Sequence, residues 1–258
     1  MLIPSLNTAQ PKLVVFDFDG TLAANKQPLE QLMAVKLAQL LERMAVGITS
    51  VDGLPNLLKM VARLPASAGF ANLYLLPASG GALYRYRDGG WDKVYEETIP
   101  DTEARTIERA LREGAESTGF IDLATEAWGK RVVRRGAEVA LLALGADAPF
   151  SEKYAWDPEK TRRRALLRAV ADRLPNGFHA YIGGTATIAV TKAGIDKAYG
   201  LRQLCARLAI PEQDALYIGD ELYEEGNDEP VLDTNAQALA VRSPADTARA
   251  IVSLLAAS

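Results

Sequence analysis

The sequence contains very little cysteine and histidine, with one of each, Cys205 and His179, among 258 residues. A single cysteine excludes an intrachain disulfide, which fits a reducing cytoplasm. The one histidine precedes the strand-like segment 180–182, and this argues against a histidine-rich zinc site and against a Ser-His-Asp triad. We therefore expect the chemistry of this chain to depend on other residue types.

The chain also lacks a strong charge of one sign and a long apolar run. Its formal net charge is −4, which gives no electrostatic basis for binding nucleic acid or an anionic membrane. No apolar stretch approaches the length of a membrane span, and residues 1–10 lack the basic start and the apolar run of a signal peptide. We expect a cytoplasmic protein whose partners are small molecules, without nucleic acid or membrane.

The most informative stretch is LVVFDFDGTL, residues 13–22. Its apolar start is typical of a buried strand in a parallel sheet. Ligands bind at the carboxyl ends of such strands, which is where Asp17 and Asp19 are expected. Because side chains alternate along a strand, these two carboxylates should point the same way.

This pair of carboxylates suits phosphoryl transfer. One can act as a nucleophile that forms an aspartyl-phosphate, and the other can protonate the leaving alkoxide and then deprotonate water. Two close anions would repel each other and the phosphate, so a divalent cation is implied, and Mg²⁺ prefers such hard oxygen ligands. Gly20 allows a sharp turn, and the Thr21 hydroxyl can bond to phosphate or to the backbone.

The remaining chain alternates predicted strands and helices, as parallel α/β proteins do. A helix is expected within 28–44, a strand over 46–50, a second helix over 54–64 and a strand over 72–76. The pattern then changes to a predicted β-hairpin, 83–86 with 91–95, across an Asp-Gly turn. We interpret this change as the start of an inserted α+β module at 86–189, which leaves 1–85 and 190–258 as an α/β core.

Three further residues complete a chemical set with Asp17 and Asp19. Lys197, at the start of a predicted helix, can keep the nucleophile charged and balance the phosphate. Asp220 ends a predicted strand, 215–220, that should lie beside the first strand and can supply a metal ligand. Asp228 can orient Lys197 or metal-bound water, as groups around a metal site do. Each of these has an ordinary structural interpretation when taken alone.

These motifs resemble those of the haloacid dehalogenase superfamily, whose first motif uses its first Asp as nucleophile and its second as acid/base. Its second motif ends a strand in Ser or Thr, for which Ser50 is the better match and Thr49 the reserve. The segments NLYLLPASGGALY, YIGGTATIAVTKAG, GIDKAYGL and YIGDELYEEGNDEPV extend the likeness to the phosphomannomutase-like group over nearly the whole chain.

The resemblance implies a Rossmann-like core, an α/β cap and Mg²⁺. It implies an aspartyl-phosphate on Asp17, with Asp19 and Lys197 also catalytic. Phosphate is expected at Thr21, Ser50 and Lys197. The metal residues that it implies are Asp17, Asp19, Asp220 and Asp228, supported by Asn227.

The departures from the phosphomannomutase pattern lie in the cap. Arg135 matches the first substrate-binding arginine, but the second is replaced by Ala146, after Gly145. The third falls near Lys153, which keeps the charge and loses the bidentate fork of an arginine. The Ser-x-Asp pair of the group becomes Thr187-Ile188-Ala189, without a carboxylate.

The substrate-binding residues of the cap differ from the phosphomannomutase pattern, whereas the catalytic residues are all present. This combination predicts a Mg²⁺-dependent phosphatase acting on a small phosphorylated metabolite, with a sugar phosphate as the expected class. The first alternative is a phosphomannomutase that interconverts mannose 6-phosphate and mannose 1-phosphate. Such a mutase must hold a bisphosphate in both orientations and needs strong recognition of the distal phosphate. The second alternative is a non-catalytic relative that binds a phosphorylated ligand. A homodimer formed through the cap is left open.

Overall fold

The apolar run that precedes the paired aspartates forms β1 (Leu13–Asp17), which lies between β10 and β2 in the larger sheet. All five residues of β1 are buried. Alternate side chains point to opposite faces, so Phe16 joins the apolar core on one face and Val15 joins the core on the other. A strand buried on both faces is what the unbroken apolar run predicts for a parallel sheet.

The structure is a computed structural model that describes residues 10–25 and 27–256. Residues 1–10 are the segment in which we expect no signal peptide. Of these, the structure describes only Gln10. The chain forms two units. The core unit comprises the chain up to Glu96 and from Asp196 onward, and the second unit comprises Glu97–Ile195. Among the helices in the described part of the chain, none has the length and apolar character needed to cross a membrane.

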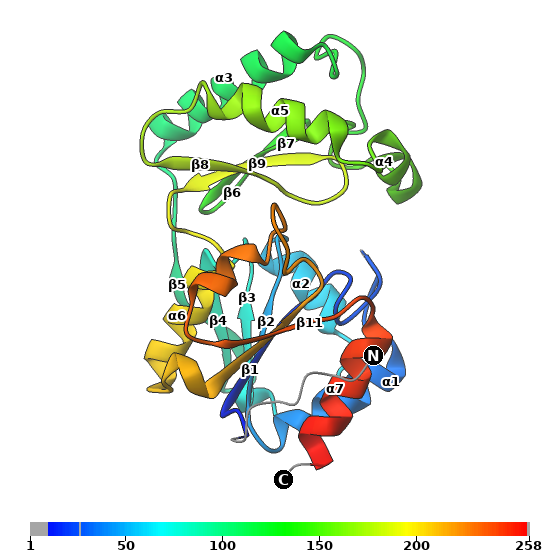
Figure 1. Ribbon diagram of the computed structural model, residues 1–258, viewed down its shortest axis with the longest axis vertical. Coiled ribbons are helices and arrows are strands. Elements are labelled where there is room, and N and C mark those ends of the chain that lie inside the picture. Colours follow the sequence, from blue (N-terminus) through cyan, green and yellow to red (C-terminus); the bar gives the residue numbers. More distant parts are fainter. Residues whose placement is uncertain (1–9, 26, 257–258) are drawn as a thin grey trace. The chain divides into compact units, whose positions relative to one another are not determined.

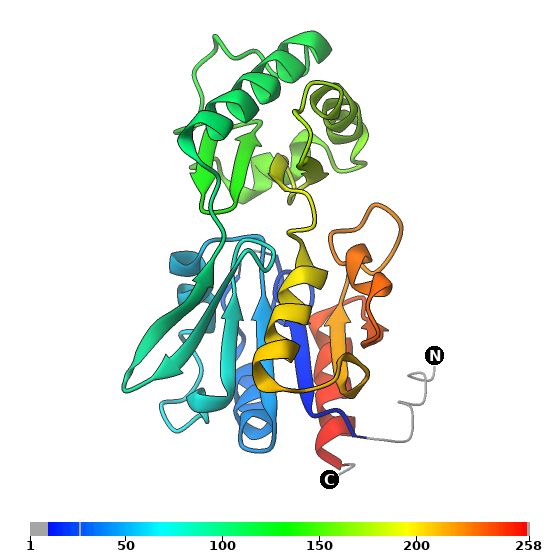
Figure 2. The same ribbon diagram turned by 90° about the vertical axis from the view of Figure 1, so that its left-hand side faces the viewer.

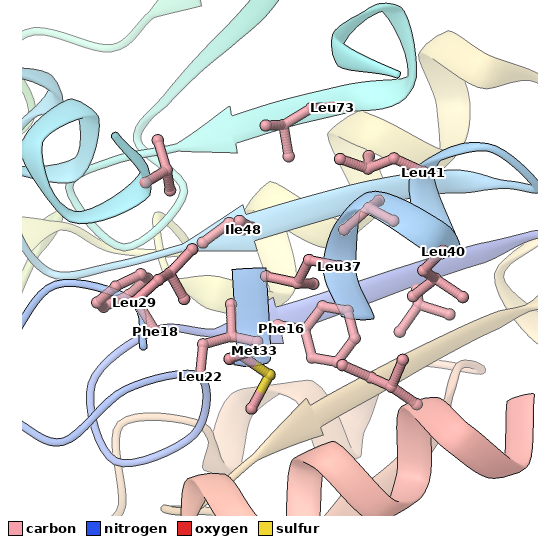
Figure 3. Close-up of a cluster of buried hydrophobic side chains, with 14 of the residues drawn as sticks. Phe16, Phe18, Leu22, Leu29, Met33, Leu37, Leu40, Leu41, Ile48 and Leu73 are labelled. Carbon is pink, nitrogen blue, oxygen red and sulfur yellow. The ribbon is translucent and has the colours of Figure 1, made fainter. Parts of the chain in front are cut away.

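The core unit contains a seven-stranded sheet in the order β11-β10-β1-β2-β3-β4-β5. Four strands run parallel to one another and to β1: β2 (Ala45–Thr49), β3 (Leu73–Leu76), β10 (Ala215–Gly219) and β11 (Gln237–Ala240). One face is covered by α1 (Gln31–Leu41), α2 (Leu54–Val61) and α7 (Pro244–Ala256), and the other by α6 (Lys197–Leu208) (Figures 1 and 2). In Figure 3, Leu37 and Leu40 of α1 lie around Phe16.

The predicted hairpin is present as β4 (Ala82–Arg87) and β5 (Gly90–Glu96), but it belongs to the core unit. Strand β4 pairs antiparallel with β3, so the hairpin extends the core sheet at its edge. The predicted start of the insertion at residue 86 therefore falls inside β4, and the second unit begins at Glu97. The difference arises because a hairpin that continues a sheet and one that opens a new module share the same sequence signals.

The second unit contains a four-stranded antiparallel sheet in the order β6-β7-β9-β8. Its strands are β6 (Val132–Arg135), β7 (Glu138–Leu142), β8 (Phe178–Ile182) and β9 (Thr187–Lys192), and its helices are α3 (Asp101–Thr118), α4 (Phe150–Trp156) and α5 (Thr161–Ala171). Helices α3 and α5 pack on one face, where Ile107 and Leu166 join Leu141 and Ile188 in a separate apolar core. Strand β9 continues past the predicted end of the insertion at 189, and the unit ends at Ile195.

Candidate active site

The carboxyl ends of β1 and β10 bring two predicted aspartates to one edge of the core sheet. Asp17 is the last residue of β1, and Asp220 directly follows β10. The two strands are adjacent and parallel, with Phe16 opposite Ile218, so residues beyond these positions emerge together. This edge is where open parallel sheets place their ligands.

Lys197 connects this edge to α6, of which it is the first residue. The preceding Asp196 caps the helix by accepting a 2.8 Å hydrogen bond from the Tyr199 amide, which fixes where α6 begins. The Lys197 side chain is buried, and its ammonium donates to Asp17 Oδ1 at 2.7 Å and to Asp228 Oδ1 at 2.7 Å. It also donates to the side-chain oxygen of Asn227. Three predicted residues, Asp17, Asn227 and Asp228, thus accept hydrogen bonds from this lysine.

Asp228 is completely buried and is held by donors from three places in the chain. Besides Lys197, its Oδ1 accepts a 2.5 Å hydrogen bond from the Tyr217 hydroxyl, and its Oδ2 accepts a 3.0 Å bond from the Glu221 amide. Sequence reasoning missed Tyr217, because a tyrosine inside an apolar strand is normally interpreted as core. The only available signal was that it shares a face of β10 with Gly219, two residues further along.

The site carries more negative than positive charge. Burial raises the pKa of Asp17 well above its ordinary value, with Lys197 opposing this shift and Asp228 adding to it. Burial also raises the pKa of Asp220 to about 6, and Asp228 again contributes. For Lys197, burial lowers the pKa, but the carboxylates of Asp17 and Asp228 outweigh burial and raise it. One ammonium does not balance three carboxylates, so this edge of the sheet favours an additional cation.

The donor set fits Mg²⁺. Asp17, Asp220 and Asp228 each have a carboxylate oxygen within 4.8 Å of those of the other two. Hard oxygen ligands of this kind are what Mg²⁺ prefers. Asp19, also predicted at the metal, lies outside this group of three. It is half-buried in the turn after β1, where its backbone forms a bridge with Ala23.

Gly20 and Thr21 shape the environment of Asp220. The backbone of Gly20 has φ +85°, and a Cβ atom at this position would overlap the Asp220 carboxylate. The hydroxyl of Thr21, predicted to bind phosphate or backbone, donates to Asp220 Oδ1 at 3.0 Å. The sharp turn after the first motif thus makes room for Asp220 and supplies one of its hydrogen bonds.

We expect Gly20→Ala to weaken Mg²⁺ binding about tenfold, the lower end of the effects seen when the surroundings of a metal ligand are disturbed. Gly89→Ala is the matched control, because Gly89 has φ +84° and nothing lies within 4 Å of the added methyl group. Both variants should lose about 1–2 kcal/mol of stability from the left-handed backbone. Calorimetric Mg²⁺ titration of the two proteins would contradict this account if their affinities fell equally.

Ser50 and Thr49 lie at the end of β2, next to β1. Thr49 is opposite Asp17 in the register of β1 and β2, and Ser50 follows it. Both side chains are buried. The Ser50 oxygen accepts a 3.1 Å hydrogen bond from the Asp52 amide. Within residues 10–25 and 27–256, nothing forms a hydrogen bond with the Thr49 hydroxyl. Both hydroxyls therefore stay candidates for contact with phosphate.

The three substrate residues predicted for the cap all lie in the second unit, and two of them, Arg135 and Thr187, lie at opposite ends of β7. Arg135 lies opposite Glu138 at one end of β7, and Thr187 lies opposite Leu142 at the other end. Four residue steps along a strand separate these ends by about 13 Å. Arg135 forms an ion pair with the buried Glu138 at 3.6 Å, and Lys153 donates to the Ala146 carbonyl at 2.9 Å. The charge of Arg135 is thus offset within the unit.

Comparison with known proteins gives a family match and several similar folds. The model of a haloacid dehalogenase-like hydrolase family matches residues 152–258. The N-terminally truncated IMP-nucleotidase of Plasmodium falciparum is 18% identical, with a TM-score of 0.69 over 96% of this chain and 71% of that chain. SMU.1108c from Streptococcus mutans UA159 is 15% identical, with a TM-score of 0.65 over 95% of this chain and 99% of that chain. A search of the curated proteins finds no match.

The matched residues 152–258 include three of the residues that meet at the candidate site, Lys197, Asp220 and Asp228. At identities this low, the similarity to solved structures shows the fold.

Proposed function

We propose that this chain, whose residues 152–258 match the model of a haloacid dehalogenase-like hydrolase family, is a Mg²⁺-dependent phosphatase that hydrolyses a small phosphate monoester through an aspartyl-phosphate on Asp17. The observation that supports this most strongly is the buried Lys197 ammonium, which joins Asp17 to Asp228 beside Asp220. A lysine so placed keeps a carboxylate ionised and offsets the charge of an incoming phosphate.

In the first chemical step, an oxygen of Asp17 attacks the phosphorus and forms the aspartyl-phosphate. The bond from phosphorus to the leaving oxygen breaks, and the carboxylic acid of Asp19 gives that oxygen its proton. In the second step, Asp19 takes a proton from water, whose oxygen attacks the phosphorus. The bond between phosphorus and Asp17 breaks, which restores the carboxylate and releases inorganic phosphate.

The other residues of the core unit would hold the reacting groups. Asp17, Asp220 and Asp228 are the residues that would hold Mg²⁺, which when bound supplies positive charge to the transferring phosphoryl group. Lys197 favours the ionised form of Asp17 against the effect of burial, and it orients the carboxylate. Ser50, Thr21 and Lys197 are proposed to bind the phosphate oxygens, and this requires that Thr21 and Lys197 share hydrogen bonds now made to aspartates.

The second unit supports hydrolysis over the phosphomannomutase alternative. A mutase needs strong cationic recognition of a distal phosphate, but Arg135 is paired with the buried Glu138 and lies at the far end of β7 from Thr187. A hydrolase needs only water at the aspartyl-phosphate. A monophosphate with an uncharged, hydroxyl-rich remainder, such as a sugar phosphate, is the substrate class that we propose.

Arg135→Ala is expected to raise KM for a sugar phosphate more than it lowers kcat. A residue that only binds stabilises the bound substrate and the transition state equally, so its loss weakens binding without slowing the chemical step. The variant should also lose about 1–3 kcal/mol of stability, since Glu138 stays buried without its ion pair. Arg134→Ala is the control on the opposite face, where the guanidinium pairs with Asp101 and Glu108. A pure fall in kcat for Arg135→Ala would contradict a binding role.

The experiment that tests the proposed function is release of phosphate from a panel of phosphorylated metabolites, with Mg²⁺ and with EDTA. Sugar phosphates form the main group, and IMP is included because the similar Plasmodium falciparum fold is named an IMP-nucleotidase. Mannose 1-phosphate with mannose 1,6-bisphosphate tests the mutase in parallel. Metal-dependent phosphate release supports the proposal, whereas isomerisation without net release would overturn it in favour of the mutase.

A further inference from the structure

Tyr217 is a completely buried tyrosine in β10 whose hydroxyl points at the candidate site. It donates a 2.5 Å hydrogen bond to Asp228 Oδ1. An ionised carboxylate can only accept, so the phenol must supply the proton in this bond. Charge-assisted hydrogen bonds of this kind are about twice as strong as neutral ones. The bond therefore restricts how the Asp228 carboxylate can turn.

Asp228 is fixed at both of its oxygens. Oδ1 also accepts from Lys197 at 2.7 Å, and Oδ2 accepts from the Glu221 amide at 3.0 Å. The absence of a side chain at Gly219 permits this packing, because a Cβ there would overlap Oδ2 and lie 2.8 Å from the Tyr217 ring. Rotation of the carboxylate would break the bonds from Tyr217, Lys197 and Glu221 together.

The orientation of Lys197 depends in turn on Asp228. An ammonium has three protons, and the structure gives those of Lys197 three side-chain acceptors, Asp17, Asn227 and Asp228. The bond to Asp228 on one side of the ammonium directs another of its protons toward Asp17. A displaced Asp228 would draw the ammonium away from the nucleophile.

We infer that Tyr217 is a positioning residue: its hydroxyl holds Asp228, which holds Lys197 against the nucleophile Asp17. The inference rests on the proposed function for its kinetic consequence, but the contact between Tyr217 and Lys197 through Asp228 can be tested without any activity. The hydroxyl of Tyr217 donates to Asp228, and in this inference its effect reaches Asp17 through Asp228 and Lys197.

The test compares Tyr217→Phe with Tyr95→Phe. Both remove one hydroxyl from the core unit, and Tyr95 donates its bond of 2.6 Å to a backbone carbonyl, that of Gly80, rather than to a carboxylate. For Tyr217→Phe we expect kcat to fall by about 10–100-fold, as for other groups that orient site residues, with KM nearly unchanged. For Tyr95→Phe we expect both constants to stay as in the parent protein.

A second readout uses the metal-free protein and needs no turnover. Nitrogen-15 NMR of lysine side chains detects buried, hydrogen-bonded ammonium groups, and Lys197→Met identifies the Lys197 signal. We expect this signal to shift or broaden in Tyr217→Phe and to stay unchanged in Tyr95→Phe. Site-specific Tyr217→p-aminophenylalanine, which keeps the ring and restores an N–H donor, should recover both the signal and much of kcat.

The outcomes separate the inference from the proposed function. A parent protein without phosphatase activity would sink the proposed function, and the lysine signal would still decide the role of Tyr217. An unchanged signal in Tyr217→Phe would overturn the inference, as would an unchanged kcat in an active protein. A Tyr217→Phe protein that does not fold while the p-amino variant folds without activity would also overturn it.

Discussion

Replacing Asp17 by asparagine is expected to abolish phosphate release, with kcat falling by about 10⁴–10⁶-fold, as when an enzyme loses its nucleophile. An amide oxygen does not form the aspartyl-phosphate, so the first chemical step has no route. The fold should be retained, because the side-chain oxygen of asparagine can still accept the hydrogen bond from Lys197. The substitution also removes one of several buried negative charges that lie around a single ammonium.

Steady-state phosphate release and thermal unfolding, measured on the same preparation, check this expectation. Asp214→Asn is the matched control, since Asp214 directly precedes β10, whereas Asp220 follows the strand at its other end. Its ion pair with the exposed side chain of Lys12 contributes below about 1 kcal/mol. Comparable turnover by Asp17→Asn and the parent protein would remove Asp17 as the nucleophile.

Lys197→Met has the second large expected effect, and it acts on both stability and activity. Without the ammonium, Asp17 and Asp228 face each other as buried carboxylates with no counter-charge. Removing one partner of a buried ion pair costs about 3–5 kcal/mol, so the metal-free variant should unfold at a much lower temperature. Loss of positive charge at the reacting phosphate should lower kcat by about 10²–10³-fold.

Two further variants identify the cause of that instability. Lys93→Met removes an ammonium from an exposed ion pair with Glu96 and should change stability by less than about 1 kcal/mol. Lys197→Met combined with Asp17→Asn removes one of the unpaired charges and should recover part of the lost stability. A double variant no more stable than Lys197→Met would show that packing of the lysine stem, rather than charge, is responsible.

Short, contiguous patterns in the sequence predict the secondary structure and the fold class well. The run LVVF before Asp17 predicts a buried strand, and the α/β class with a separate sheet-containing insertion is confirmed. The resemblance to haloacid dehalogenase hydrolases is borne out over residues 152–258, which match a model of that hydrolase family. The assignment to the phosphomannomutase-like group stays a prediction, as do the roles of the individual site residues.

Contacts between residues far apart in the chain could not be predicted from the sequence. The hydroxyl of Tyr217 reaches Asp228 because a loop returns across the end of β10, and no local pattern encodes that return. The pairing of Arg135 with Glu138 depends on their positions across the turn between β6 and β7. Matching Arg135 to a family position identified a possible role without revealing that its charge is offset.

The measurement that tests the central claim most directly is trapping of the phosphorylated protein. The Mg²⁺-loaded protein is mixed with radiolabelled acetyl phosphate, a small activated phosphoryl donor, and quenched in acid within one turnover. We predict label that stays with the protein, is released by hydroxylamine as expected for an acyl phosphate, maps to the peptide containing Asp17 and is absent from Asp17→Asn. Rapid hydrolysis without protein-bound label, or label on another residue, would contradict a mechanism through Asp17.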